Sequence, residues 1–193
     1  MDIETGRTMN VELIKAELSQ TKVIANLVPY YIYDLSEQMG CQCSESGQFG
    51  GEDDLPQYWS EPVAEQQYVW PKGTKGFPFI IRANGELGGF ALVKRIGETT
   101  PLHFEIGAFF ILRKFRRRHV GDSVAKRLFS MFPGEWTVGS MAGNTPANQF
   151  WASVIASYSK NQFQTTTGKD NSGRFDMIFH HFCSYPESQI VKE

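Results

Sequence analysis

The stretch FFILRKFRRRHVGDS, residues 109–123, places an apolar run directly before a cluster of arginines. Aromatic and branched side chains at 109–112 predict a buried strand, and apolar residues recur at helical spacing over residues 123–131. The first backbone N–H groups of a helix lack internal partners and lie at the positive end of its dipole, so a tight turn at this junction can bind phosphate oxygens. Arg116, Arg117 and Arg118 add positive charge at the same place. The pattern therefore predicts a pyrophosphate-binding turn.

Generic phosphate motifs narrow the class of protein. The chain has no GxxxxGK[ST] segment, and no GxGxxG follows a predicted strand, which excludes a Walker-type loop and leaves a dinucleotide fold without support. The segment RRRHVG, residues 116–121, resembles the [QR]-x-x-G-x-[GA] pyrophosphate loop of the GNAT superfamily of acetyl-CoA-dependent N-acetyltransferases. His119 stands where the first glycine of that pattern is usual.

Two further segments carry the same resemblance. NTPANQFW, residues 144–151, resembles the N-x-x-A-x-x-F-Y helix that follows the fifth strand in the superfamily, with Trp151 in place of tyrosine. Glu105 lies eleven residues before Arg116, the spacing at which the histone-acetylating members carry their catalytic glutamate. The motifs cover residues 77–152, and outside that range only the order of predicted elements agrees.

The predicted elements alternate between strands and helices, and their first half reads as antiparallel. An Asn84-Gly85 hairpin turn joins two strands, and a structured loop with a short helix near Tyr58 is expected over residues 41–75. This order excludes a doubly wound parallel sheet. The resemblance implies a GNAT fold of mixed α/β class, with a mostly antiparallel sheet splayed between its fourth and fifth strands and helices on both faces. Strands are expected at 10–16, 77–82, 87–95, 103–112, 136–141 and 175–183, the last closing the sheet, and helices at 23–38, 121–131 and 146–157.

The resemblance also implies the cosubstrate and the residues that hold it. Acetyl-CoA would place its pantetheine arm in the gap between the splayed strands and its pyrophosphate on the loop. The expected cofactor-binding residues are Phe109, Phe110, Ile111, Arg116, Arg117, Arg118, His119, Val120, Gly121, Asp122, Ser123, Asn144 and Trp151.

Transfer of an acetyl group to an amine needs a base, because the protonated amine cannot attack a thioester. Glu105 is the first candidate, and its alternative interpretation is an outward-facing strand residue paired with Lys94 or Arg95. His103 lies two residues earlier on the same strand face and could replace or assist it. The histidines at 180 and 181 are interpreted as residues at the edge of the core.

The sulfur that leaves the acetyl group also needs a proton, which the superfamily often takes from the tyrosine of the F-Y pair. Trp151 is a poor proton donor and is most simply a core aromatic residue. Tyr158 is about 10 Å further along the helix and too distant to substitute. Water or the departing acceptor is left for this role.

Length and composition fit one domain that spans residues 1–193. The chain is 41% hydrophobic, which suffices for a single core, and no Pro/Ser/Gly linker divides it. It has no apolar run of membrane-spanning length and no signal-peptide h-region, so we expect a cytoplasmic protein without a membrane partner. Cys41, Cys43 and Cys183 are expected to be reduced thiols, and no metal is expected.

Charge is unevenly distributed along the chain. Residues 23–71 contain eight acidic residues and no lysine or arginine. If this region forms the acceptor wall, as the resemblance implies, it would favour a cationic small-molecule amine. A solvated acidic loop explains the same pattern, and both interpretations stay open. A homodimer is compatible with the sequence.

The function predicted is transfer of acetyl from acetyl-CoA to a primary amine by direct attack in a ternary complex. The acceptor stays open among polyamines or aminoglycosides, free amino acids, and protein N-termini or lysines. One alternative is a catalytically degenerate GNAT-like domain that binds CoA or a protein partner, since His119 and Trp151 depart from the pattern. A second alternative treats the basic residues at 113–118, 126 and 127 as a nucleic-acid patch, but the pI near 6.1 and the lack of any nucleic-acid motif disfavour it.

Overall fold

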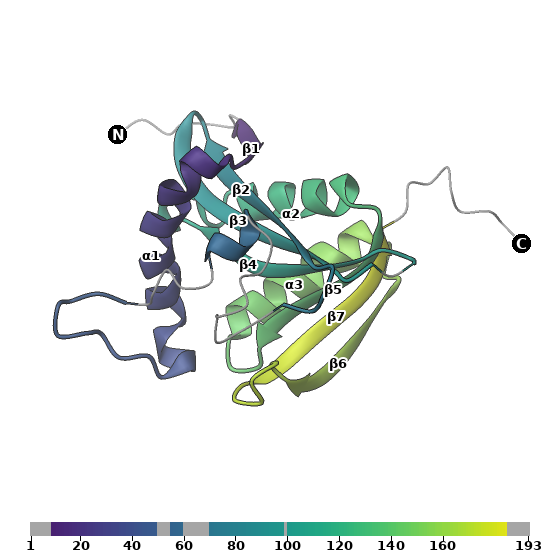
Figure 1. Ribbon diagram of the computed structural model, residues 1–193. Helices are drawn as coiled ribbons and strands as arrows, with labels where there is room; N and C mark the ends of the chain where they lie inside the picture. Colours follow the sequence, from purple (N-terminus) through teal and green to yellow (C-terminus); the bar gives the residue numbers. More distant parts are fainter. Residues whose placement is uncertain (1–8, 50–54, 60–69, 99, 185–193) are drawn as a thin grey trace, which may run out of the picture.

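A seven-stranded mixed sheet forms the centre of the protein in a computed structural model that describes residues 9–49, 55–59, 70–98 and 100–184 (Figure 1). The strand order is β1-β2-β3-β4-β5-β7-β6, and every neighbouring pair is antiparallel except β4 and β5, which are parallel. The strands are β1 (Val11–Lys15), β2 (Lys75–Ala83), β3 (Glu86–Ile96), β4 (His103–Ile111), β5 (Gly134–Met141), β6 (Phe163–Lys169) and β7 (Asp176–Ser184).

Helices cover both faces of this sheet. One hydrophobic cluster joins helix α1 (Thr21–Met39) to β2, β3 and β4, and a second cluster joins α2 (Val120–Met131) and α3 (Thr145–Tyr158) to the opposite face. We call these the α1 face and the α2/α3 face. Short 3-10 helices are η1 (Leu18–Gln20), η2 (Leu55–Tyr58) and η3 (Arg113–Phe115). Within the described residues, no helix has the length and apolarity that crossing a bilayer requires.

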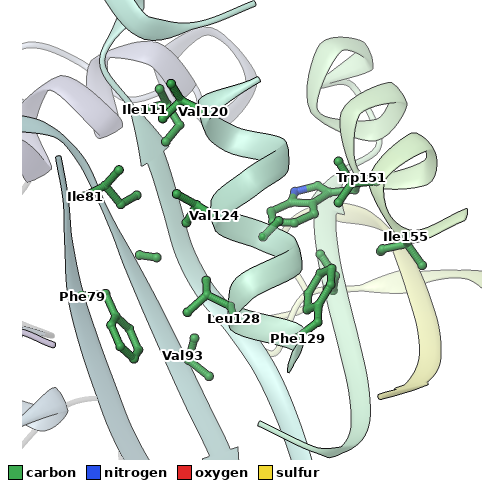
Figure 2. Close-up of a cluster of buried hydrophobic side chains, with 14 of the residues drawn as sticks. Phe79, Ile81, Val93, Ile111, Val120, Val124, Leu128, Phe129, Trp151 and Ile155 are labelled. Atoms are coloured by element: carbon green, nitrogen blue, oxygen red, sulfur yellow. The ribbon is translucent and has the colours of Figure 1, made fainter. Parts of the chain in front are cut away.

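The α2/α3 face holds the larger core (Figure 2). Val120, Val124 and Leu128 recur at helical spacing along α2 and are fully buried against β2, β3 and β4. Aromatic rings fill the space between α2, α3 and the end of the sheet, with Phe129 and Trp136 at 5.0 Å between ring centroids. This packing fixes the start of α2 and the start of α3 relative to the strands.

The sheet splays between its two parallel strands. β4 and β5 pair only at His103↔Glu135, Phe104↔Trp136 and Glu105↔Thr137, after which the ladder ends. β4 continues for six further residues with β3 as its partner on the other side. The result is the GNAT fold expected from the resemblance, with the gap located after Glu105.

A β-bulge lies in β4 just beyond this point. Val93 pairs with Ile106 and Leu92 pairs with Ala108, so Gly107 is the extra residue. As a result Ala108 packs in the α1-face cluster, whereas Phe109 packs in the α2/α3-face cluster. The bulge therefore reverses which face each later residue of β4 occupies.

The local signals in the sequence agree with the observed elements, with one exception. Gly40 ends α1 in the left-handed conformation with φ 63°, and Asn84 and Gly85 form the hairpin turn with φ 51° and 79°. The prediction that the strand at 175–183 closes the sheet is wrong, because β6 is the edge strand and β7 lies between β5 and β6. Most of β6 is exposed and rich in threonine, so it has no apolar alternation to reveal it.

His180 makes the fold sensitive to pH. Its side chain is buried, Nδ1 lies 3.0 Å from Thr165 Oγ1, and Nε2 has no hydrogen-bond partner among the described residues. Burial, and then the neighbouring His181, lower the pKa of His180. The unfolded chain binds a proton near the ordinary histidine pKa of about 6.5 while the folded chain resists it, so stability falls as the pH drops below that value.

We therefore expect the melting temperature to decrease between pH 7 and pH 5 in the wild-type protein and to decrease less in His180→Gln, whose amide does not titrate. Thermal melts across this range measure the difference. Equal pH dependence in the two proteins would contradict the assignment, whatever the absolute stability of the variant.

Candidate active site

Glu105 lies at the point where β4 and β5 separate. It forms the last pair of the parallel ladder with Thr137, and its neighbour Phe104 is buried in the α2/α3-face cluster. Strand alternation therefore places Glu105 and His103 on the same face of β4, which is the α1 face. Both side chains are half-buried. No ion pair joins Glu105 to Lys94 or Arg95, and among the described residues its carboxylate makes no hydrogen bond.

Thr137 connects His103 to a second histidine. His103 Nε2 lies 2.9 Å from Thr137 Oγ1, and the same oxygen lies 3.1 Å from His181 Nδ1. Sequence reasoning missed Thr137 and interpreted both late histidines as core-edge residues. The structure separates them, because His180 is buried on the α2/α3 face and His181 is half-buried on the α1 face.

The turn before α2 has the backbone of an anion-binding loop. Arg117 and His119 both adopt the left-handed conformation, with φ 59° and 60°, and alternate with residues of negative φ. Such alternation turns successive N–H groups toward one concave side. Within the described chain, the N–H groups of residues 117–122 make no hydrogen bond of ordinary geometry. His119 thus has the backbone that a glycine would supply there, at the cost of some strain.

The last two residues expected in the loop contribute less to it. The Ser123 N–H is already donated to the His119 carbonyl at 3.0 Å, so it is not available to a phosphate. The Asp122 carboxylate forms an ion pair with Lys126 at 3.0 Å, which offsets a negative charge near the expected anion. The N–H groups of this turn that are left without an acceptor among the described residues therefore run from Arg117 to Asp122.

Arg116 is directed away from this surface, contrary to the expectation that its charge adds to the phosphate site. Its Nε donates to the Ile111 carbonyl at 2.7 Å, and its terminal nitrogen pairs with Asp34 on α1. The guanidinium also lies 5.6 Å from the centroid of the Phe110 ring. Arg113 pairs with the same carboxylate at 3.4 Å. Arg116 therefore ties the loop to β4 and α1, while Arg117 and Arg118 are exposed.

The backbone along the gap also differs from the prediction at one residue. The Leu112 N–H donates to Gly88 on the β3 side, so by alternation the backbone of Phe110 also faces β3. The N–H groups of Phe109 and Ile111 and the carbonyl of Phe109 face the gap. Phe110 is therefore not placed to bind a ligand through its backbone, and the Ile111 carbonyl is already bonded to Arg116.

The start of α3 forms the other side of the gap. The Asn144 side chain caps the helix by accepting the Ala147 N–H at 3.2 Å. Asn148, which sequence reasoning missed, donates from Nδ2 to the carbonyls of Met141 at 3.2 Å and Ala142 at 3.0 Å. This second asparagine, one turn into the helix, fixes α3 to the end of β5.

Trp151 belongs to the core. Only 5% of its surface is exposed, and its ring packs edge-on to Phe109 at 5.0 Å and to Phe150 at 4.9 Å. The Phe109 and Phe150 rings stack at 5.9 Å. These three rings fill the space behind the splayed strands. The role of Trp151 is therefore structural, and it is not a proton donor.

A cavity of about 210 Å³ lies on the α1 face beside the bulge, between α1, η2 and strands β3 and β4. Aromatic rings dominate its wall, and Lys94 Nζ lies 4.9 Å from the centroid of the Trp70 ring. A Cβ at Gly107 would lie 2.1 Å from the Tyr58 hydroxyl, so any larger residue there would displace the Tyr58 side chain. Burial raises the pKa of Tyr31, which also lines the cavity, to about 12, so its phenol stays protonated at neutral pH.

The acidic wall is only partly described. Asp34 is neutralised by Arg113 and Arg116, whereas Glu37 and Glu45 are exposed. The other acidic residues of the segment, at 52, 53, 54, 61 and 65, lie outside the described residues. Among the described side chains no cluster of His, Cys, Asp or Glu is arranged to hold a metal ion, and Cys41, Cys43 and Cys183 are free thiols.

Comparison with known proteins decides the family. The model of the acetyltransferase (GNAT) family matches residues 48–154, more than half of the chain. The chain belongs to the GNAT acetyltransferase family. Its matched region includes the strand and η2 walls of the cavity, the bulge, the turn before α2 and most of α3. No match was found among curated protein sequences.

Solved GNAT structures share the fold at low identity. The ribosomal-protein-S18-alanine N-acetyltransferase of Escherichia coli superposes with a TM-score of 0.57 at 11% identity, covering 95% of this chain and 100% of that one. The spermidine N-acetyltransferase of Vibrio cholerae, in complex with CoA and spermine, gives 0.53 at 12% identity, covering 90% and 95%. An acetyl transferase of Salmonella typhimurium that modifies the N-terminal serine of ribosomal protein L7/L12 gives 0.54 at 14% identity, covering 90% and 94%.

The left-handed residue before α2 makes a stability prediction for this GNAT chain. His119→Gly should keep or raise stability, because glycine adopts φ 60° without strain. His119→Ile should lower the free energy of unfolding by up to about 1 kcal/mol, part of the roughly 1–2 kcal/mol that a side chain costs in this region, because a β-branched side chain tolerates it less well than histidine does. Urea unfolding measures both variants. Arg118→Ile, next to it but without positive φ, is the control, and an equal loss there would show that φ at 119 is not the cause.

Proposed function

We propose that this chain is an acetyl-CoA-dependent N-acetyltransferase that moves acetyl to a primary amine by direct attack in a ternary complex. The observation that carries the proposal is the position of Glu105. This residue forms the last pair of the β4–β5 ladder, and its carboxylate lies on the open α1 face. The loop that follows the same strand presents a concave run of N–H groups. The carboxylate suits a cationic acceptor and the N–H groups suit an anion, and the gap between β4 and β5 lies between these two features.

The residues on the gap fit CoA. The N–H groups from Arg117 to Asp122 would hold its pyrophosphate, with the dipole of α2 behind them. The backbone of Phe109 and the N–H of Ile111 would pair with its pantetheine arm, as an added strand pairs with a sheet edge. The bound thioester supplies an activated acetyl group.

The amine proton is assigned to Glu105 and His103. A carboxylate at the apex of the gap attracts an ammonium, and either Glu105 or His103 accepts its proton, which leaves the neutral amine able to attack. Trp151 is buried among aromatic rings, and the Tyr158 hydroxyl is bonded to Ser184 at 2.7 Å at the far end of α3. Neither is placed to protonate the departing sulfur, so water or the acceptor amine fills that role.

The acceptor assignment rests on similarity and on the cavity. The neighbours with this fold include proteins named for acetylating spermidine and protein N-termini, all amines. The aromatic cavity beside the bulge would accommodate the apolar part of the acceptor behind its amine, against the rings of Tyr58 and Trp70, whose contact with a cation is already made by Lys94.

The geometry of the basic residues disfavours the nucleic-acid alternative. Arg113 and Arg116 are paired with Asp34, and Lys114 is paired with Glu86 at 2.5 Å. Further along α2, Lys126 pairs with Asp122 and Arg127 donates to the Val11 carbonyl. These contacts distribute the cluster over several elements, so it does not form one continuous cationic surface for a phosphate backbone.

Acetyl-CoA should stabilise the fold through the loop at 117–122. A ligand held at about 100 times its dissociation constant adds roughly 2.7 kcal/mol, which thermal melts detect. Gly121→Glu should abolish the shift by placing a carboxylate beside the phosphates. Since any Cβ at 121 meets the Phe150 ring at 3.2 Å, Gly121→Ala is the matched control for packing. No shift in the wild type at millimolar acetyl-CoA would refute the cosubstrate, and an undiminished shift in Gly121→Glu would refute the location.

Glu105→Gln should leave folding and acetyl-CoA affinity nearly intact while lowering kcat by about 10²–10⁴-fold, the usual contribution of a general base. The loss should shrink as the pH rises, because more of the amine is already neutral. Release of free CoA thiol with a panel of amines measures the rate, and His103→Gln in parallel shows whether the histidine contributes. Full activity of Glu105→Gln at pH 7 would remove this carboxylate from the mechanism.

A further inference from the structure

A continuous chain of hydrogen bonds crosses the α1 face of the sheet from β4 to β6. His103 on β4 bonds to Thr137 on β5 at 2.9 Å, and Thr137 bonds to His181 on β7 at 3.1 Å. His181 Nε2 then lies 2.9 Å from Thr166 Oγ1 on the edge strand β6, where Thr166 is exposed. One end of this chain lies beside Glu105, and the other end reaches solvent.

Strand register keeps the members of the chain together. Thr137 pairs with Glu105 on one side and with His181 on the other, so the hydroxyl lies between the two histidines. His103 uses Nε2 for this contact, and its Nδ1 has no hydrogen bond among the described residues. Nδ1 is therefore the ring nitrogen that is left free to bond a substrate.

The threonine hydroxyl couples the two histidines, because it has a single proton to donate. If His103 donates its Nε2–H to Thr137, then Thr137 donates to His181 Nδ1, and His181 carries its own proton on Nε2 toward Thr166. In the reverse direction Thr166 donates to His181, which donates from Nδ1 to Thr137, and His103 carries its proton on Nδ1. The neutral histidines must therefore share the same tautomer, Nε2–H in the first direction and Nδ1–H in the second.

We propose that Thr137 and His181 form a proton relay for His103, an inference that rests on the proposed function. In the first direction His103 presents the Nδ1 lone pair to the acceptor and takes its proton there. The Nε2–H bond of His103 then breaks as a bond forms to Thr137 Oγ1, and the original hydroxyl proton of Thr137 moves to His181 Nδ1. His181 becomes the imidazolium and releases its Nε2 proton at the β6 edge.

After this release the hydrogen bonds run in the second direction, with the proton of each histidine on Nδ1. Proton exchange with solvent returns them to the first direction. The relay moves one proton from the acceptor to water without leaving a charge beside the gap. His181 and Thr137 are positioning residues in this scheme, because they act on the acceptor only through His103. Glu105 keeps its place next to them and attracts the ammonium to the same point.

Other charged groups near the relay set its electrostatics. Glu105 on β4, Glu135 on β5 and Lys94 on β3 lie on the same face, and Cys183 follows His181 on that face of β7. The pKa of the Cys183 thiol is raised by burial and by Glu135, so the thiol is neutral at pH 7. His180 lies on the opposite face and also interacts electrostatically with His181. The two glutamates favour a cationic relay, whereas Lys94 opposes it.

Histidine NMR tests the relay without requiring any activity. Long-range ¹H–¹⁵N spectra of the free protein should show His103 and His181 in the same tautomer, and Thr137→Val or His181→Gln should shift the titration of His103. Thr137→Ser keeps the hydroxyl and should restore it. Thr165→Val removes the equivalent threonine contact to His180 on the opposite face and should leave His103 unchanged.

Steady-state rates with an amine identified by the panel test the use of the relay. Thr137→Val and His181→Gln should each lower kcat near neutral pH by about tenfold, part of the 10²–10⁴-fold range of base catalysis, and should move the ascending limb of the pH profile. Thr137→Ser and Thr165→Val should follow the wild type. An active wild type whose Thr137→Val and His181→Gln variants keep both the pH profile and the His103 titration would overturn the relay alone. A wild type inactive toward every amine would overturn the proposed function and with it any catalytic use of the relay.

Discussion

The short parallel contact between β4 and β5 is the constraint on which the rest of the molecule depends. Three residue pairs join the β1–β4 part of the sheet to the β5–β7–β6 part, and beyond them the strands separate. A sheet opened in this way exposes the unpaired N–H groups of Phe109 and Ile111 and the carbonyl of Phe109, which need water or a ligand as partner. The opening is stable because Phe109, Phe150 and Trp151 fill the wedge behind it.

The bulge at Gly107 lets the two ends of β4 place their side chains differently. Before the bulge, strand alternation places His103 and Glu105 on the open α1 face and Phe104 in the core. Strict alternation would then continue by placing Phe109 and Ile111 on the α1 face. The extra residue moves both side chains to the α2/α3 face, where Ile111 meets α2 and Phe109 meets α3. A single strand thus supplies polar chemistry at one end and aromatic packing at the other.

Features that depend on local chemistry could be predicted from the sequence. Gly40 and the Asn84-Gly85 pair ended a helix and turned a hairpin through their tolerance of positive φ. The three GNAT motifs were sufficient for the family and for the position of the gap. Partners that are distant in the chain could not be predicted from the sequence, because Asp34 lies 82 residues from Arg116 and His181 lies 44 residues from Thr137. The face reversal at Gly107 was also invisible, since a bulge leaves no mark in the hydrophobic pattern of so short a strand.

The role of Arg116 explains a choice between two residue types. The family pattern admits glutamine or arginine at this position, and a glutamine amide has the donor needed for one bond to the Ile111 carbonyl. Arginine makes that bond with Nε and still has a terminal nitrogen to reach Asp34 on α1. In this chain the two positions are thus linked as a pair. An exchange of Arg116 for glutamine, conservative by the family pattern, would leave Asp34 with Arg113 as its remaining partner and would weaken the link between α1 and the loop, so tolerance at 116 depends on the residue at 34.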